Sequence, residues 1–268
     1  MHFLSRKGLK RMPPEILSFF PLHSMDSIED PINRYPSNLS PDSKIRPFRF
    51  QNTGLMRIRE ARTERDRLQA KELVQKMYTL RGFKCENIVL DSPHSTTLVA
   101  EKENGWVIGT VTIHLDSPEE GLHSDDGYKP EIDCLRRNGR RLCEFNGLAV
   151  DPSIRSKHLL ARLFHIAMIY PAKLFSISDC IIEVSYSHAR FYERLLGFRR
   201  IAEGRACKRV DSVGALLHAD FSSLGERLQN VGGLMKNAEG DKSFFHYGLS
   251  PTEARRVLFQ LKATQSSA

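Results

Sequence analysis

Three titratable side chains stand inside apolar segments, where burying a charge is costly. Glu144 lies in the run "LCEFNGLAV", and Glu183 lies in "CIIEV". Tyr192 follows His188 by one helical turn in "HARFYERLLGF", so both side chains can face the same cleft. A partly desolvated carboxylate has a raised pKa and is a better base, and a phenol can donate a proton. These residue types therefore indicate a site for proton transfer.

Hydrophobic periodicity predicts the elements that position these residues, from residue 55 onward. Strands are expected at 55–61, 142–150, 179–184, 199–204 and 214–220, with a hairpin around Glu-Asn-Gly at 96–115. Helices are expected at 64–80, where Thr63 can be the cap, within 117–140, at 158–175, at 188–198 and twice near the C-terminus, where "SPTE" is a capping box. This alternation predicts an α/β fold, with a central mixed sheet and helices on both faces.

The N-terminal part of the chain has a different composition. Residues 1–54 contain seven of the thirteen prolines and show little periodicity. We expect an irregular N-terminal arm at 1–54, with one short helix at 13–20, and a catalytic domain with C-terminal helices at 55–268.

The overall composition argues against several classes of protein. With 268 residues, 40% of them hydrophobic, the chain can bury a sizeable core. A net charge of +8 favours an acidic partner but is too dispersed to indicate nucleic acid. Five scattered cysteines indicate neither a disulfide framework nor a metal site, and they fit the reducing cytoplasm. No apolar run reaches the roughly 18 residues needed to span a bilayer.

Three segments, taken together and in order, resemble one known family. They are "MYTLRGF", "YKPEIDCLRRNGRRLCEFNGLAVDP" and "HARFYERLLGF". Within residues 55–205 the chain is similar to the GNAT acyltransferase superfamily, and especially to the long-chain N-acyl amino acid synthases, relatives of the autoinducer synthases. The resemblance implies a GNAT fold. It also implies transfer of an acyl group from an acyl carrier protein thioester to the α-amine of an amino acid, with no tightly bound cofactor.

The resemblance further implies three catalytic roles. Glu144 would be the base that deprotonates the amine, directly or through water. A bulge at Gly147-Leu148 would aim backbone amides at the oxyanion, and Tyr192 would protonate the leaving thiolate. The residues alone leave simpler alternatives open: an ion pair between Glu144 and the arginines at 140–141, an ordinary strand glycine, and a core aromatic.

Acceptor binding is expected at three side chains. Arg81, in "TLRGF", could bind the carboxylate of an amino acid in a bidentate fashion. Glu183 could bind the acceptor amine or brace the site, and His188 could orient the tyrosine or contact the donor. The alternatives are a solvated arginine, a salt bridge across the sheet and a structural histidine.

Donor binding is expected on the turn "RSKHLL" and on the strand before it. The expected donor-binding residues are Leu148, Val150, Arg155, Ser156, Lys157 and His158. Relatives that use coenzyme A have glycines where His158 and Leu160 stand, and these side chains crowd a pyrophosphate. The single phosphate of an acyl-phosphopantetheine arm is easier to hold, so acyl carrier protein is preferred over coenzyme A.

Basic clusters could steer that acidic carrier toward the donor site. The clustered basic residues are Arg136, Arg137, Arg140 and Arg141, and Arg155, Lys157 and Arg162. Three other functions remain open from the sequence alone: an acyl-homoserine-lactone-type synthase, an acyl-CoA-dependent N-acyltransferase, and a GNAT-shaped module that binds an acyl chain without turnover.

Overall fold

The computed structural model describes residues 48–50, 54–83, 92–154, 156–207, 212–235 and 241–265. Its strands are β1 (Phe48–Phe50), β2 (Gly54–Glu60), β3 (Ser95–Lys102), β4 (Val107–Leu115), β5 (Leu142–Val150), β6 (Asp179–Ser185), β7 (Arg199–Cys207) and β8 (Ser212–Asp220). Its α-helices are α2 (Glu64–Thr79), α3 (Asp125–Arg137), α4 (Lys157–Leu174), α5 (Ala189–Leu195), α6 (Phe221–Val231) and α7 (Pro251–Gln265). Two short 3-10 helices are η2 (Tyr186–His188) and η3 (Phe244–Tyr247).

All eight strands form one mixed sheet in the order β1-β2-β3-β4-β5-β6-β8-β7. Neighbouring strands are antiparallel except β5 and β6, which run parallel. The expected strands and hairpin are confirmed, and Gly105 makes the hairpin turn at φ 76°. The end of the expected N-terminal arm forms β1, which pairs with β2. The helix expected at 13–20 lies outside the described residues.

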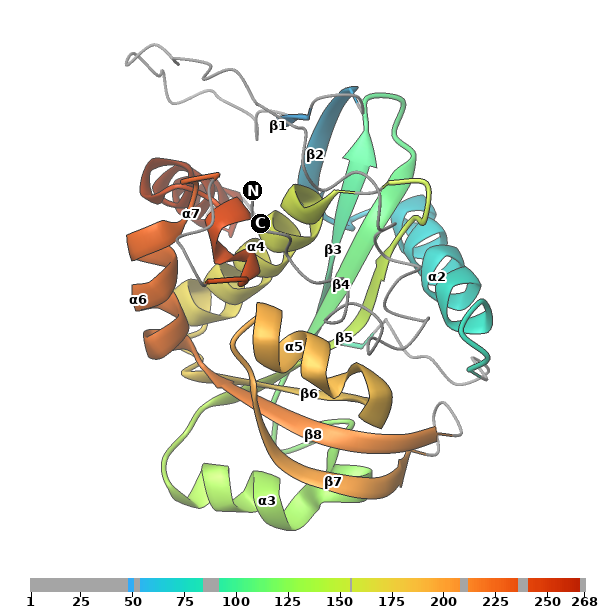
Figure 1. The fold of residues 1–268 in the computed structure, drawn as a ribbon, viewed down its shortest axis with the longest axis vertical. Coiled ribbons are helices and arrows are strands. Elements are labelled where there is room, and N and C mark those ends of the chain that lie inside the picture. Colours follow the sequence, from blue (N-terminus) through green and yellow to red (C-terminus); the bar gives the residue numbers. More distant parts are fainter. Residues whose placement is uncertain are drawn as a thin grey trace, which may run out of the picture.

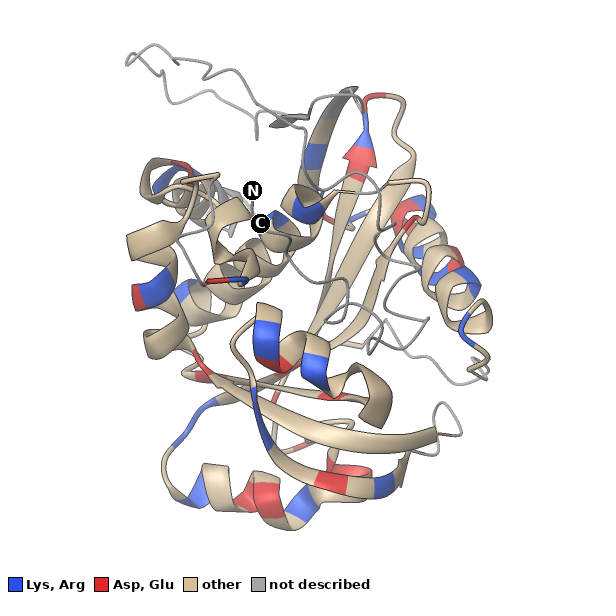
Figure 2. Ribbon diagram, in the orientation of Figure 1, with Lys and Arg blue, Asp and Glu red and all other residues tan. Residues whose placement is uncertain are grey.

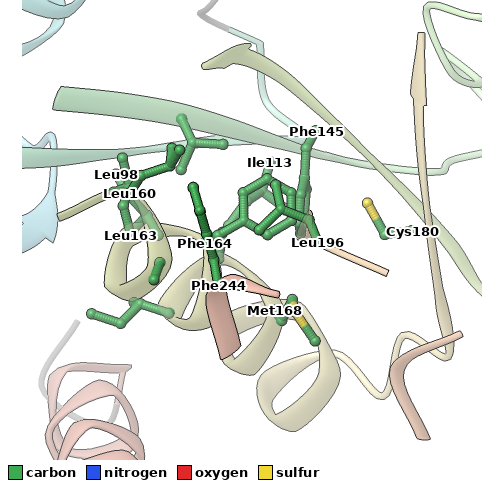
Figure 3. Close-up of a cluster of buried hydrophobic side chains, with 14 of the residues drawn as sticks. Leu98, Ile113, Phe145, Leu160, Leu163, Phe164, Met168, Cys180, Leu196 and Phe244 are labelled. Carbon is green, nitrogen blue, oxygen red and sulfur yellow. The ribbon is translucent and has the colours of Figure 1, made fainter. Parts of the chain in front are cut away.

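Helices cover both faces of the sheet, as the alternating pattern predicts (Figure 1). On one face α2 buries Leu73, Val74 and Met77 against β3, β4 and β5, and α3 packs beside β7. On the other face α4 carries the largest core cluster, to which α5, α6, η3 and α7 contribute (Figure 3). A sheet covered in this way keeps its central strands apolar on both sides.

Side chains that the sequence singled out as caps begin two of these helices. Thr63 and Asp66 form a reciprocal capping box at α2. At α7 the backbone N–H of Ser250 donates to Glu253, and the Ser250 hydroxyl accepts from the Glu253 N–H. Both caps bind backbone groups that the first turn of a helix would otherwise leave without partners.

The two central strands separate after a short parallel pairing. β5 and β6 pair from Leu142 with Asp179 to Glu144 with Ile181. Beyond these pairs no further β5–β6 partners occur among the described residues, and the two strands diverge. The divergence makes room between the strands at the centre of the sheet.

A β-bulge lies in β5 just beyond the point of separation. The pairing with β4 shifts between Thr110 and Thr112, where β5 has one residue more than its partner. Gly147 supplies the left-handed backbone that the bulge requires, at φ 58°. Because of the extra residue, Phe145 and Leu148 both lie on the α4 side although they are three positions apart. The bulge expected at Gly147-Leu148 is thus present.

Candidate active site

A cavity of about 180 Å³ opens where β5 and β6 separate. Much of its wall is apolar and comes from core side chains, of which Phe145, Leu160 and Phe164 are drawn in Figure 3. Six residues expected from the sequence line it: Arg81, Glu144, Leu148, Glu183, His188 and Tyr192. They come from the end of α2, from β5, β6, η2 and α5, so the fold brings together residues that are far apart in the chain.

Glu144 is buried, with 1% of its surface exposed, and its carboxylate is held from one side. The Ser124 hydroxyl donates to Oε1 at 2.7 Å, and the Ser124 backbone N–H donates to Oε2 at 3.1 Å. Arg140, one of the arginines considered as its partner, instead pairs with Asp179 and Asp220. The carboxylate is therefore fixed in position at the wall of the cavity.

Tyr192 projects from α5 beside Tyr78, in the last turn of α2, and Arg81, in the turn that follows the helix. Burial raises the pKa of its hydroxyl, the nearby Tyr78 raises it further, and the positive charge of Arg81 opposes the shift. The Arg81 guanidinium is itself largely buried, and this burial lowers its pKa. At neutral pH Tyr192 is therefore protonated, and an arginine stays charged in such a place because its ordinary pKa is above 12.

Glu183 and His188 occupy the β6 side of the cavity. A Cβ added at Gly214 of β8 would lie 2.7 Å from Glu183 Oε1, so the Glu183 carboxylate packs closely against the β8 backbone. His188 Nδ1 is hydrogen-bonded to the Ser185 hydroxyl, and its ring contacts Phe83 at a centroid distance of 6.4 Å. The expected facing of His188 and Tyr192 toward one cleft is confirmed.

The residues expected to bind the donor are not all in this cavity. Leu148 lines it, but the Val150 side chain is buried in the core beneath α4, because the bulge turns that part of β5 toward the helix. The Ser156 hydroxyl accepts from the Leu159 N–H as the cap of α4. Arg155 lies outside the described residues.

Two further donor candidates pack on the C-terminal part of the chain. The Lys157 ammonium lies 5.5 Å from the ring centroid of Tyr247, and the His158 ring meets the same tyrosine at 4.9 Å. Both side chains stand at the first turn of α4, whose N-terminus attracts anions.

The expected basic clusters are partly neutralised within the fold. Arg136 binds Asp116, Asp125 and Asp133, and Arg162 is buried and paired with Glu253. With Arg140 also paired to Asp179 and Asp220, these arginines have partners inside the protein. The prediction that these clusters form an open basic surface is therefore wrong for Arg136, Arg140 and Arg162.

Several residues of the site were not expected from the sequence. His123 and Asn146 line the cavity, and Ser124 holds the Glu144 carboxylate. Asn146 could have been found, because it is a second polar residue two positions after Glu144 in the same strand. His123 and Ser124 lie just before α3, 20 or more residues from Glu144, and no local pattern connects them to it.

The described part of the chain shows neither a metal-ion site nor a membrane-spanning helix. The described residues contain no group of three or more His, Cys, Asp or Glu that could hold a metal ion. None of the described helices combines the length and the hydropathy that crossing a membrane requires.

Comparison with known proteins gives one family and one well-matched fold. A model of the family "N-acyl amino acid synthase FeeM" matches residues 69–220, more than half of the chain. The solved structure of FeeM, an N-acyl amino acid synthase from uncultured soil microbes, matches with a TM-score of 0.60 and 23% identity, over 66% of this chain and 96% of that chain. An acyl-CoA N-acyltransferase from Pseudomonas aeruginosa matches with a TM-score of 0.43 and 13% identity, over 61% of this chain and 97% of that chain. No match is found among curated protein sequences.

The structural match to FeeM agrees with the expected GNAT fold, a mixed sheet between helices that separates at its centre. The family match covers the strands and helices that carry Glu144, Leu148, Glu183, His188 and Tyr192. The chain is an N-acyltransferase with the GNAT fold and belongs to the FeeM family of N-acyl amino acid synthases.

Proposed function

We propose that the enzyme transfers a long-chain acyl group from an acyl carrier protein thioester to the α-amine of an amino acid. The observation that carries the proposal is the convergence of a base, an acid, a bulged strand and an arginine on one cavity. In this assignment the four are Glu144, Tyr192, the bulge at Leu148, and Arg81. Each step of the reaction then has a group within the same cavity.

Glu144 starts the reaction by taking a proton from the acceptor ammonium. The two hydrogen bonds from Ser124 hold the carboxylate still. Glu144 passes the first proton to solvent, the free amine attacks the thioester carbon, and the carbonyl oxygen becomes an oxyanion while the nitrogen gives its second proton to Glu144. The backbone at Leu148, where the bulge interrupts the regular ladder with β4, supplies N–H donors to that oxyanion.

Tyr192 completes the transfer when the tetrahedral intermediate collapses. The carbon–sulfur bond breaks, and the phenol hydrogen-bonds to the sulfur and delivers its proton. The raised pKa of Tyr192 keeps that proton in place until negative charge develops on the sulfur. The leaving group then departs as a neutral thiol.

Arg81 selects an acceptor that carries a carboxylate. Its guanidinium lies in a largely buried place beside Tyr192, where an ion pair with a substrate carboxylate is less screened by water. An amino acid bound in this way presents its α-amine close to Glu144, with Glu183 and His188 as further contacts.

The donor assignment depends on the apolar wall and on the first turn of α4. Phe145, Leu160 and Phe164 favour an alkyl chain over an acetyl group. The N-terminus of α4, with Lys157 and Ser156, offers room for one phosphate of a phosphopantetheine arm. The described cysteines form no disulfide, which supports the proposal of a cytoplasmic setting.

A direct assay tests this proposal. The protein is incubated with one long acyl group, presented either on acyl carrier protein or on coenzyme A, together with a mixture of amino acids. Mass spectrometry of the amides formed gives the acceptor, and kcat/KM for the two donors gives the preferred thioester. A higher kcat/KM for the carrier supports the proposal. An equal or higher value for coenzyme A overturns the donor assignment, and no amide from either donor favours a binding module without turnover.

A further inference from the structure

Asn146 is a polar residue of the cavity that the reaction described above leaves unused. Its side-chain carbonyl oxygen, Oδ1, is buried and has no hydrogen-bond partner among the described residues. Burying a carbonyl without a partner destabilises a protein, and such groups are rare in folded chains. A site that keeps one has a use for it or a ligand that satisfies it.

The place of Asn146 in β5 shows which ligand atom can reach it. It follows Glu144 by two positions, so both side chains lie on the same face of the strand. Gly147, at φ 58°, comes directly after it and begins the bulge. Asn146 is therefore between the carboxylate that takes the proton and the backbone assigned to the oxyanion.

The attacking nitrogen must also lie between the Glu144 carboxylate and the backbone assigned to the oxyanion. After Glu144 has removed one proton, the amine still carries two N–H groups, and its lone pair has to point at the thioester carbon. A hydrogen-bond acceptor on the side of the nitrogen that faces away from the thioester carbon would fix that orientation. When the new carbon–nitrogen bond forms, the nitrogen becomes positively charged, and a hydrogen bond from its N–H to a carbonyl strengthens.

We propose that Asn146 Oδ1 accepts an N–H of the acceptor amine and orients its lone pair for attack. The inference rests on the proposed acyl transfer and adds a group that touches the nucleophile. In the step, Glu144 has already passed the ammonium proton to solvent; nitrogen bonds to the thioester carbon, the carbonyl electrons move to oxygen, and the nitrogen passes its second proton to Glu144. The carbon–sulfur bond then breaks, and the sulfur receives its proton from Tyr192.

The proposal predicts that one variant loses activity and gains stability. Asn146→Leu keeps the size of the side chain and removes the carbonyl. We expect its kcat/KM for amide formation to fall by roughly 10²-fold, as for the loss of one preorganised polar contact to the reacting atoms. Its melting temperature should rise by about 2–4 °C, because a buried carbonyl without a partner is gone.

The experiment uses a long-chain acyl-pantetheine and mixed amino acids with the full-length protein. Thiol release in the absence of any amine measures thioester hydrolysis, a reaction with water that does not need the amine contact. Asn146→Asp, which keeps a carbonyl-type acceptor, should retain more of the amide rate than Asn146→Leu. Asn230→Leu makes the same exchange at an exposed position of α6 and should leave the amide rate unchanged.

Each outcome decides the proposal. A loss of amide formation in Asn146→Leu, with hydrolysis retained and melting temperature raised, supports it. Equal losses of amide formation and hydrolysis, or a lowered melting temperature, mean that Asn146 is structural. Wild-type protein that forms no amide removes the proposed acyl transfer and this role with it, whereas an active Asn146→Leu protein removes this role alone.

Discussion

Glu144 and Tyr192 are placed in the cavity by different means. Glu144 is fixed by two hydrogen bonds from Ser124, and its strand supplies a rigid backbone. Tyr192 is held by packing, with Phe191 at 5.3 Å and Phe198 at 6.1 Å between ring centroids, on a helix of only seven residues. Since its hydroxyl and not its ring does the proposed chemistry, the two contributions can be separated by mutation.

Tyr192→Phe should lower kcat for acyl transfer by roughly 10²-fold, as expected for losing general-acid assistance. The melting temperature should stay close to that of the wild type, because the ring packing is conserved. Steady-state assays with a fixed acyl thioester measure the effect. Tyr186→Phe, at an exposed tyrosine of η2, is the matched control and should be fully active. An unchanged kcat in Tyr192→Phe would remove this residue from the mechanism.

Glu144→Gln should change the shape of the pH–rate profile. Below the pKa of the acceptor amine the substrate is an ammonium, and without the carboxylate nothing in this role removes its proton. The loss should therefore be greatest at low pH and should shrink as the pH approaches the pKa of the acceptor amine. A profile with the wild-type shape, merely scaled down, would contradict the assignment of Glu144 as the base.

At the scale of elements, periodicity predicted nearly all of the described fold. The strand "LCEFNGLAV", the capping box at Thr63 and the tyrosine helix appear where their patterns place them. The pairing order of the sheet depends on contacts between distant segments, and for this the resemblance to the GNAT superfamily was needed. Within the site, local spacing identified Glu144 and Tyr192 but not Ser124.

The sequence did not show the neighbours of several residues expected to bind the donor or to form the basic clusters. Val150 was expected at the donor, but a single extra residue at Gly147 moves the following side chains to other surroundings. Arg136 looked like part of a basic surface, yet three aspartates surround it, and two of them are 11 and 20 residues away in the chain. Ion pairs of this kind are decided by tertiary structure, so a count of charges overestimates the open basic surface.

Helix α5 offers a different basic surface for the proposed carrier. Arg190 and Arg194 are exposed on it, on either side of Tyr192 in the sequence, and Figure 2 shows blue on this helix. The acid of this helix, Glu193, pairs with Arg200. In the proposed reaction Tyr192 meets the thioester sulfur, so an acyl carrier protein that delivered the thioester would come close to α5, where positive charge would speed its association.

Reversing both charges, with Arg190→Glu and Arg194→Glu, should lower kcat/KM for the acyl carrier protein by about tenfold or more at low salt. The same acyl group on a small pantetheine should be used as before. The control reverses Arg65 and Lys71, which are exposed in the first half of α2, and gives the same change in net charge. Carrier kinetics at increasing ionic strength complete the test, since exposed charges are screened over about 8 Å at physiological salt. Equal losses with carrier and pantetheine would show that α5 was damaged and not its docking surface.

On the scale of the whole molecule, the C-terminal segment, described at 221–235 and 241–265, begins where the family match ends, at residue 220. It packs on α4 next to the active cavity. Phe164 lines that cavity and also a second, apolar one of about 10 Å³ whose wall includes Phe244 and Phe245. The neighbouring His165 has 7% of its surface exposed, and its Nδ1 accepts a hydrogen bond from the Leu249 N–H at 3.0 Å. The segment is therefore attached to α4 through a histidine that must stay neutral.

That attachment makes stability depend on pH. Burial lowers the pKa of His165 to about 4, with Glu253 opposing and Arg162 adding to the shift. Below pH 6.5 the unfolded chain gains a proton that the folded chain does not, so the free energy of unfolding falls as pH falls, by roughly 2 kcal/mol at pH 5. Asp179, with its pKa lowered to about 2, loses its contribution only at lower pH.

His165→Asn keeps an acceptor for the Leu249 N–H and does not titrate. In urea unfolding at pH 7.5 and pH 5, this variant should be less stable than wild type at the higher pH, because the smaller side chain leaves a gap, but should lose about 2 kcal/mol less on acidification. Equal losses in the two proteins would mean that His165 is not the group through which acid acts on the packing of the C-terminal segment.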